Sequence, residues 1–504
     1  MKRLLAGGLV TAASLFLAAC GGSSSSSPPE LAPPPPPPPP PPAPTALLQV
    51  IHASADAPSV DVLVDGSVPA GLAGVPFAVA SPYLELPAGT ISAAVNALLA
   101  DETAVEVLAV PEFTLEADTA YTVIAAGSTA ALLAGSPGEA DLALQATGNP
   151  LGLFVLTRPV LASIDGVRVQ VLHGAPSAPE VDVYVTAPET ELGAATPATF
   201  AFGETIDLDV VPAATYRIRV TPAGAGAVVF DSGPVPLPAG ADLSVIAVDN
   251  TGPGSSPITL LAVLADGTVL ELRDGGSDAV AGLTAVHNSP TAPEVCVVAD
   301  DAATTEVERV ELFAGVPFRG FGYLGEVPPG SYLVGLEVFD AITGCAGAVA
   351  ITFDDAVGFA PGSEATAIVV GAIGDDSLEL LALADDLRPI ATEARVRIVH
   401  ASPATPAVDI FVVPAGTEIT DPAVSPAFSG VEFRGETGFV ALPPGSYDVF
   451  VTGTGDTTPA IALQGVEFTG GEVISAIASD PAVDETLPGL ILIDHLALKA
   501  PSVD

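Results

Sequence analysis

A short motif with a histidine and, nine residues later, an aspartate or a cysteine occurs four times in this chain. A proline lies six residues after each histidine, and a valine directly precedes each final residue. The four pairs are His52 and Asp61, His173 and Asp182, His287 and Cys296, and His400 and Asp409. An imidazole and a carboxylate that converge can bind a metal ion or act as an acid–base pair. The alternative is structural: the histidine hydrogen-bonds to the carboxylate or to the loop backbone and fixes the connection between two strands.

The make-up of the motif favours the structural interpretation. Two ligands per copy fall short of the roughly four that a closed zinc site requires. The third copy, which ends in Cys296, has no carboxylate at that position. We therefore predict that these residues hold loops in place and that the motif is not a metal site.

Other catalytic groups are weakly represented. Ser54, Ser289 and Ser402 each lie two residues after a motif histidine, but Ala175 takes that place in the second copy. The sequence contains neither a G-x-S-x-G elbow nor an H-E-x-x-H zinc motif. We predict that the protein is not an enzyme. A hydrolase with a site built between domains is the least favoured alternative.

Two cysteines follow Cys20, and both fall within the third repeated unit, at Cys296 and Cys345. In an oxidising compartment, two cysteines in one domain favour a disulfide. It would close a loop of about 50 residues, and this closure stabilises a domain by roughly 3–4 kcal/mol in the chain-entropy model. The covalent link would also explain how Cys296 can replace an aspartate. Metal binding by the two thiols is the alternative.

The charge balance excludes some partners. The chain has 60 acidic and 14 basic residues, a formal net charge of −46. Nucleic acid is therefore not expected as a partner, because phosphate binding needs clustered lysine and arginine. Acidic pairs occur without EF-hand spacing at Asp300–Asp301, Asp354–Asp355, Asp375–Asp376 and Asp385–Asp386. We expect no cofactor, with weak Ca²⁺ binding at a domain junction as the alternative.

The motif copies are 121, 114 and 113 residues apart, which is the size of small domains rather than of solenoid repeats. A second marker keeps the same register, because a phenylalanine lies ten residues before a proline in every unit. These pairs are Phe77 and Pro87, Phe202 and Pro212, Phe318 and Pro328, and Phe433 and Pro443. The predicted repeats span residues 46–148, 167–270, 281–386 and 394–500.

Short apolar runs separated by proline and glycine turns predict β-strands, including residues 121–126, 243–248, 367–371 and 473–478. Valines alternate with polar residues along 181–185, so one face of that strand is apolar. The predicted fold class is all-β, with four tandem immunoglobulin-like antiparallel β-sandwich domains. The fifth histidine, His495, is expected to belong to the last strand rather than to bind a ligand.

The repeated segment has the pattern H-A-S-P-x-A-P-x-V-D after a strand, and the fourth copy, His400 to Asp409, shows it most clearly. In this pattern the units resemble the bacterial surface family called domain of unknown function 4397. The resemblance covers nearly all of the chain beyond residue 46. It implies extracytoplasmic β-modules that often occur in tandem, and it implies no activity. Cys296 departs from the pattern, which puts a shared role of the aspartate in doubt.

The N-terminus predicts export and lipid anchoring. A basic start is followed by an apolar stretch, and Leu17-Ala18-Ala19-Cys20 resembles the bacterial lipobox. We predict a signal peptide over residues 1–19 and acylation of Cys20, the only expected membrane contact. By the same resemblance, Gly21 in place of an aspartate favours the outer membrane. Residues 20–45 form a Ser/Pro-rich tether, in which the prolines from 33 to 42 favour an extended polyproline II helix.

These features predict a cell-envelope lipoprotein that displays tandem domains for binding or adhesion at the cell surface. Its partner would be an unknown protein or glycan. Stacking of sugars on aromatic rings is not favoured, because the chain has no tryptophan and seven tyrosines. The alternative function is a periplasmic structural or assembly scaffold.

Overall fold

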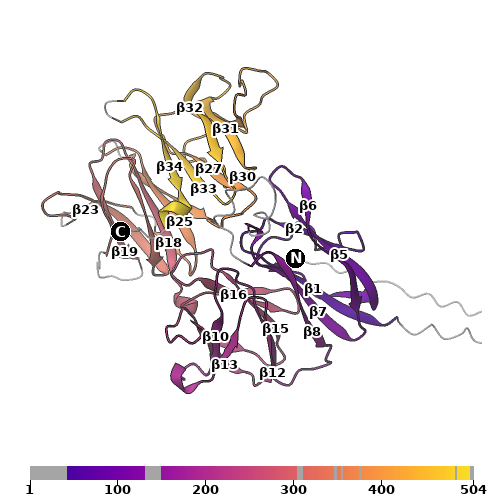
Figure 1. Ribbon diagram of the computed structural model, residues 1–504. Helices are drawn as coiled ribbons and strands as arrows, with labels where there is room; N and C mark the ends of the chain where they lie inside the picture. Colours follow the sequence, from indigo (N-terminus) through magenta and orange to yellow (C-terminus); the bar gives the residue numbers. More distant parts are fainter. Residues whose placement is uncertain are drawn as a thin grey trace, which may run out of the picture. The chain divides into compact units, whose positions relative to one another are not determined.

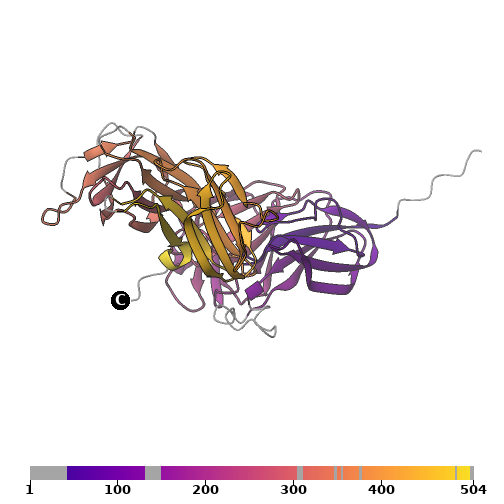
Figure 2. The ribbon, with the colours of Figure 1, turned by 90° about the horizontal axis from the view of Figure 1, so that it is seen from above.

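The computed structural model describes residues 43–130, 149–302, 310–345, 349–353, 356–373, 377–482 and 485–499. The predicted signal peptide, Cys20 and nearly all of the tether lie outside these residues, as do Asp354–Asp355 and Asp375–Asp376. The chain divides into a unit Met1–Ala43 and a compact unit Pro44–Asp504. The second unit, described below, consists of short strands coloured in sequence order in Figures 1 and 2. Within the described ranges, no helix is long and apolar enough to span a membrane.

The described residues of the first repeat form eight strands in two sheets. Its strands are β1 (Thr45–Ala53), β2 (Val60–Val64), β3 (Val79–Ala80), β4 (Leu84–Pro87), β5 (Gly89–Leu98), β6 (Ala104–Leu115), β7 (Thr119–Ala126) and β8 (Gly152–Pro159). One sheet has the order β3-β1-β7-β8, with β4 also paired to β1, and the other has the order β2-β5-β6. Strand β8 lies beyond residue 148, where the sequence pattern placed the end of this repeat.

The second repeat contains nine strands in two sheets. They are β9 (Val167–His173), β10 (Val181–Thr186), β11 (Ala198–Phe200), β12 (Thr205–Val211), β13 (Ala214–Pro222), β14 (Phe230–Leu237), β15 (Asp242–Asp249), β16 (Ile258–Leu264) and β17 (Val269–Leu272). Two 3₁₀ turns, η2 (Leu192–Ala194) and η3 (Gly276–Asp278), complete this region. The sheet orders are β12-β9-β15-β16-β17 and β11-β10-β13-β14.

The third repeat has the same arrangement. Its strands are β18 (Ala281–Asn288), β19 (Val295–Asp301), β20 (Val310–Val316), β21 (Phe321–Val327), β22 (Gly330–Val338), β23 (Val349–Thr352), β24 (Val357–Phe359), β25 (Glu364–Val370) and β26 (Glu379–Asp385). The sheet orders are β21-β18-β25-β26 and β20-β19-β22-β23, and β24 also pairs with β22.

The fourth repeat ends in a short helix. Its elements are β27 (Ala394–His400), β28 (Val408–Pro414), β29 (Phe428–Val431), β30 (Val440–Leu442), β31 (Gly445–Gly453), β32 (Pro459–Phe468), β33 (Val473–Ser479), β34 (Gly489–Asp494) and α2 (His495–Lys499). The sheet orders are β30-β27-β33-β34 and β29-β28-β31-β32.

The predicted all-β fold of tandem sandwiches is confirmed. Three of the four predicted strand segments fall within β7, β15 and β33, and the fourth, 367–371, extends one residue beyond the end of β25 at Val370. Each repeat also contains one parallel pair, formed by the motif strand and a strand late in the same repeat. The four pairs are β1 with β7, β9 with β15, β18 with β25, and β27 with β33. The remaining pairs between strands are antiparallel. The sequence pattern did not reveal the parallel pairs, because their paired residues lie 73 to 82 positions apart in the chain.

The prediction that His495 belongs to the last strand was wrong. Strand β34 ends at Asp494, and His495 begins helix α2. The Asp494 carboxylate accepts hydrogen bonds from the backbone N–H groups of Leu496 and Ala497, both at 3.0 Å. This is the geometry of a helix N-cap, which favours a helical turn over a continued strand.

The motif strands are buried on both faces, although the second face also carries polar side chains such as Gln49 and Arg397. One face packs inside its own sandwich, as Leu48 and Val50 do in the first repeat. On the other face, Ile51 shares a buried cluster with Leu172 of the second repeat. In the same way, Val286 of the third repeat is clustered with Val399 of the fourth. Contact with a neighbouring repeat therefore buries the second face of these strands.

Candidate functional site

The motif histidines end the first strand of each repeat, and each is buried, with at most 2% of its surface exposed. In every copy Nε2 lies within hydrogen-bond distance of the carbonyl oxygen of the motif proline. The distances are 2.9 Å for His52 to Pro58, 3.0 Å for His173 to Pro179, and 3.1 Å for both His287 to Pro293 and His400 to Pro406. A carbonyl oxygen can only accept, so Nε2 carries the proton and donates it. The histidine therefore closes its own loop.

Burial also disfavours the charged form of two of these rings, those of His52 and His287. It lowers the pKa of His52 from 6.5 to about 4, although the bond to Pro58 opposes the shift. Burial lowers the pKa of His287 as well. A neutral, buried imidazole whose N–H is bonded to backbone is suited to holding structure.

The phenylalanine marker packs against the same histidine. The ring centroids are 6.3 or 6.4 Å apart in an edge-to-face arrangement, for His52 with Phe77, His173 with Phe202, His287 with Phe318, and His400 with Phe433. The residue after each phenylalanine has a positive φ and donates its N–H to the carbonyl of the histidine; these residues are Ala78, Gly203, Arg319 and Arg434. The two sequence markers therefore form one structural unit, a tight turn fixed to the end of the motif strand.

The motif aspartates bond to neighbouring loops rather than to the imidazoles. Asp409 accepts backbone N–H groups from Gly430 and Gly455, both at 2.8 Å. Asp61 accepts the N–H of Gly74 at 2.7 Å. These carboxylates tie the second strand of the repeat to an adjacent turn, and the histidine and aspartate do not converge on one point.

Asp182 has the same role in the second repeat. It accepts the hydroxyl of Thr199 and, at 2.9 Å, the N–H of Gly224. Both bonds stabilise the ionised form and hold the pKa of Asp182 below its usual value.

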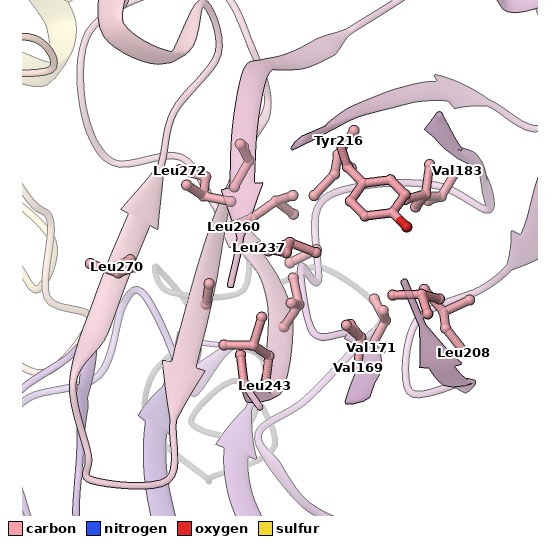
Figure 3. Close-up of a pocket in the computed structure, with 18 of the residues that line it drawn as sticks. Val169, Val171, Val183, Leu208, Tyr216, Leu237, Leu243, Leu260, Leu270 and Leu272 are labelled. Carbon is pink, nitrogen blue, oxygen red and sulfur yellow. The ribbon is translucent and has the colours of Figure 1, made fainter. Parts of the chain in front are cut away.

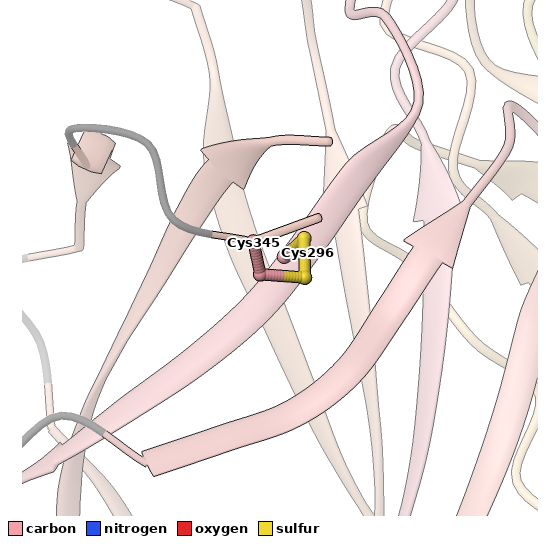
Figure 4. The surroundings of a disulfide bond; sticks show 2 residues. All are labelled: Cys296 and Cys345. Atoms are coloured by element: carbon pink, nitrogen blue, oxygen red, sulfur yellow. A yellow bond between two sulfur atoms is a disulfide. The ribbon is translucent and has the colours of Figure 1, made fainter. Parts of the chain in front are cut away.

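A disulfide joins Cys296 and Cys345 in the third repeat, with 5.8 Å between the Cα atoms (Figure 4). Cys345 follows strand β22, just as Gly224 follows β13 and Gly455 follows β31. The covalent bond therefore connects the same two segments that the aspartate connects by a hydrogen bond in the second and fourth repeats. This gives a structural reason why the third copy has Cys296 in place of a carboxylate.

Two of the three serines near the motif have hydroxyls that bond away from the imidazole nitrogens, and the buried hydroxyl of the third, Ser289, has no hydrogen-bond partner among the described residues. The hydroxyl of Ser54 donates to the carbonyl of Gly127 at 2.7 Å. The hydroxyl of Ser402 donates to the Asp480 carboxylate. A serine nucleophile needs its hydroxyl hydrogen-bonded to a base such as histidine, and neither hydroxyl has that arrangement.

Of the acidic pairs noted in the sequence, Asp385–Asp386 forms ion pairs with the fourth repeat. Asp385 of the third repeat bonds to Arg397 of the fourth at 2.6 Å, with both side chains almost fully buried. Its neighbour Asp386 bonds to Arg395 at 2.9 Å. Across the part of the chain that the structure describes, no group of three or more His, Cys, Asp or Glu side chains could hold a metal ion.

His495 lies beside this buried ion pair. Its Nε2 is 2.8 Å from the hydroxyl of Ser475, which also accepts a hydrogen bond from Arg397. Burial, together with the charges of Arg397 and Lys499, lowers the pKa of His495 to about 3. The role of Arg397 could not be predicted, because nothing in one sequence shows that an arginine on a strand will be covered by another repeat.

The second sandwich contains a large apolar cavity that the sequence analysis also missed. Its volume is about 650 Å³, and it lies between the two sheets (Figure 3). Val171 and Leu243 of one sheet and Val183 and Tyr216 of the other all face it. The corresponding space in the third sandwich is about 10 Å³. His173 and His287 line these two spaces, so the motif position is common to a sandwich with a wide interior and one with a filled interior.

A family model described as Domain of unknown function (DUF4397) matches residues 46–147, 167–271 and 281–411, more than half of the chain. The chain belongs to this family. The third DUF4397 match extends beyond the third repeat into the fourth motif, from His400 to Asp409. No curated protein matches the chain.

Solved structures with some likeness to the chain are distant. The Bacillus anthracis TIE protein is 12% identical, with 84% of this chain and 68% of that chain covered and a TM-score of 0.15. A putative cell adhesion protein from Bacteroides fragilis is 12% identical, with 44% and 98% covered and a TM-score of 0.16. The FN1–FN3 domains of chicken CNTN1 are 13% identical, with 61% and 96% covered and a TM-score of 0.12. At TM-scores this low, the likenesses do not bear on function.

Proposed function

We propose that this DUF4397 protein is a non-catalytic envelope lipoprotein that displays its four sandwiches for binding or adhesion at the cell surface. The observation that carries the proposal is the state of the four motif histidines. Each is buried and each donates its Nε2 proton to a proline carbonyl, so the residue type best suited to acid–base chemistry is used to build the repeat. Because the motif residues hold the fold together, contacts with partners would be made by surfaces of the repeats outside the motif.

The packing of the repeats supports a display role. Buried clusters join the first repeat to the second and the third to the fourth. The buried pair Asp385 and Arg397 links the last two repeats by charge. Domains joined in this way present several binding surfaces at once, which raises the overall affinity for a multivalent protein or glycan partner.

The proposed anchor is acylated Cys20, which the Ser/Pro-rich tether separates from the first sandwich. Buried acyl chains hold a protein at a membrane by about 0.8 kcal/mol per methylene group. The anchor and the tether would place the sandwiches away from the lipid surface, where a net charge of −46 avoids contact with anionic headgroups.

The experiment is protease treatment of intact source cells, followed by mass spectrometry of released peptides from residues 46–504. Release from unbroken cells is expected. Protection that is lost only when the envelope is opened would overturn surface display and favour the periplasmic scaffold. The matched control is Cys20→Ser, which should appear in the soluble fraction because it lacks the anchor.

The absence of catalysis is tested separately. Purified wild-type protein and the variant His173→Ala are compared against ester, glycoside and peptide substrates. We expect neither protein to turn over substrate and the variant to unfold at a lower temperature. Turnover by the wild type that disappears in His173→Ala would contradict the proposal.

A further inference from the structure

The cavity of the second sandwich is too large for an ordinary protein interior. Cores are normally packed to the density of organic crystals, and the cost of an apolar void rises with its volume. At about 650 Å³ the space lies within the range of ligand-binding cavities, about 300–1,000 Å³. The third sandwich, with about 10 Å³ of free space, shows that the same fold can be filled by its own side chains.

Strand register shows one position at which the second repeat lacks a ring that the third and fourth repeats carry, although the first repeat also has a leucine there, Leu115 opposite Gly89. Phe359 of the third repeat lies opposite Gly330, and Phe468 of the fourth lies opposite Gly445. The equivalent pair in the second repeat is Leu237 opposite Ala214. The two phenylalanine rings pack on Tyr332 and Tyr447, with centroids 5.9 and 5.8 Å apart. In the second repeat a leucine takes the place of such a ring beside Tyr216, and both Leu237 and Tyr216 line the cavity.

A second position shows the same loss. Phe313 lies opposite Val297 in the third repeat, and Phe428 lies opposite Ile410 in the fourth. In the second repeat, Ala198 lies opposite Val183, a cavity-lining residue. The second repeat does carry Phe200 one pair further along, where the third has Val316 and the fourth Val431. Aromatic volume is therefore shifted toward His173, and the far end of the sandwich is left open.

The exposure of the lining residues shows where the cavity meets solvent. At the end near His173, Phe200 and Val245 are buried. At the opposite end the lining residues 213–215, Pro236 and Pro238 are exposed. Leu270, also in the lining, is 52% exposed. The space is closed at the motif end and open at the turn that follows the marker proline.

The lining is apolar and carries no charged side chain. The nearby Arg217 is paired with Asp231, and Arg219 donates to Thr186 and to the carbonyl of Thr190. Tyr216 donates its hydroxyl to the carbonyl of Pro212. An anionic headgroup would meet occupied arginines in a strongly acidic protein, whereas a neutral headgroup could remain in water at the rim.

We propose that the second sandwich binds an uncharged amphiphile through its long hydrocarbon chain. The chain lies between the two sheets, and the neutral polar end remains at the rim formed by residues 213–215, Pro236 and Pro238. The ligand class is that of a neutral acyl ester, for which monoacylglycerol is the probe. This site is independent of where the cell displays the protein, because purified protein is sufficient to test it.

The test is titration of the full chain, carrying Cys20→Ser to remove any acylation, with the uncharged fluorescent probe N-phenyl-1-naphthylamine. Saturable binding of one probe per chain is expected, with displacement by 1-monopalmitoylglycerol at concentrations at least tenfold lower than by palmitate. Non-saturable binding would overturn the proposal. Displacement by palmitate at equal or lower concentration would overturn the preference for a neutral ligand.

Matched variants locate the site. Leu237→Phe restores the ring found at this register in the third and fourth repeats, and it should weaken probe binding at least tenfold while raising the melting temperature. Leu487→Phe makes the same change at a side chain that is 65% exposed, and it should bind like the parent. Ala198→Phe provides the same test if Leu237→Phe fails to fold. Unchanged binding in a folded cavity variant would overturn the proposal.

Discussion

The second and third sandwiches share a motif but differ in their interiors. In both, the histidine donates to its proline carbonyl and packs against the marker phenylalanine. The second encloses about 650 Å³ of apolar space, and the third about 10 Å³. The motif therefore fixes the end of the strand and its loop, while a few side chains outside the motif decide whether the sandwich can hold a ligand.

The two sandwiches also differ in how the second strand is held. Asp182 uses hydrogen bonds to Thr199 and Gly224, whereas Cys296 uses a covalent bond to Cys345. The bond partners Gly224 and Cys345 follow corresponding strands, so one connection has two chemical forms. The sandwich with the open interior holds this strand by hydrogen bonds, and the sandwich with the filled interior holds it by a disulfide.

The largest expected effect is on the covalent tie. Replacing both cysteines, Cys296→Ser with Cys345→Ser, should lower the free energy of unfolding of the third sandwich by roughly 4 kcal/mol, because the bond closes a loop with a sequence separation of 49. Hydrogen–deuterium exchange of β19 and β22 peptides in the full chain measures it, with β10 and β13 peptides as the internal control. Unchanged exchange in β19 and β22 would show that the disulfide does not stabilise this sandwich.

Truncation at one register position tests the difference in packing. Phe359→Ala should destabilise the third sandwich by roughly 3–4 kcal/mol, because it empties a filled core. Leu237→Ala should cost about 1 kcal/mol or less, because its side chain already borders open space and has fewer contacts to lose. Exchange of the peptides that contain β22 and β13 provides the comparison. Equal losses of stability at the two positions would mean that the cavity of the second sandwich is filled by its own side chains in solution.

Removal of the reversible tie should have a smaller effect. Asp182→Ala leaves the Gly224 N–H and the Thr199 hydroxyl without their acceptor, and it should speed exchange in β10 by roughly tenfold. Asp182→Asn keeps one acceptor oxygen, so its exchange rate in β10 should lie between those of Asp182→Ala and the parent protein. If Asp182→Ala exchanges like the parent, the aspartate is not equivalent to the disulfide.

The smallest expected effect is a pH dependence of the third sandwich. The folded pKa of His287 is lowered by burial, so unfolding takes up a proton below the ordinary value of about 6.5. The stability that this group contributes is complete above pH 6.5 and is lost as the pH falls toward the folded pKa. Exchange rates in β18 and β19, corrected for intrinsic pH effects, should show a stability loss between pH 6.5 and 5 that is reduced in His287→Gln. An equal loss in both proteins would assign it to other groups.

Much of the fold could be predicted because its signals are local or repeated. Strands such as 181–185 alternate visibly, and turns are marked by proline and glycine. The parallel pairing of β1 with β7 and the helical start at His495 could not be predicted. The first depends on segments that are distant in the sequence, and the second on two hydrogen bonds to Asp494.

The sequence by itself determined the four-fold repeat, the family, the all-β class and the pairing of the two markers with each unit, because spacing and residue type are preserved along the chain. It also narrowed the cross-link to Cys296 and Cys345, since no other cysteines lie beyond Cys20. Only the tertiary structure decided the partner of each histidine, the burial of Arg397 between repeats, and the cavity bordered by Leu237. These depend on which side chains meet across strands and repeats, and a volume left empty between two sheets has no residue of its own to mark it.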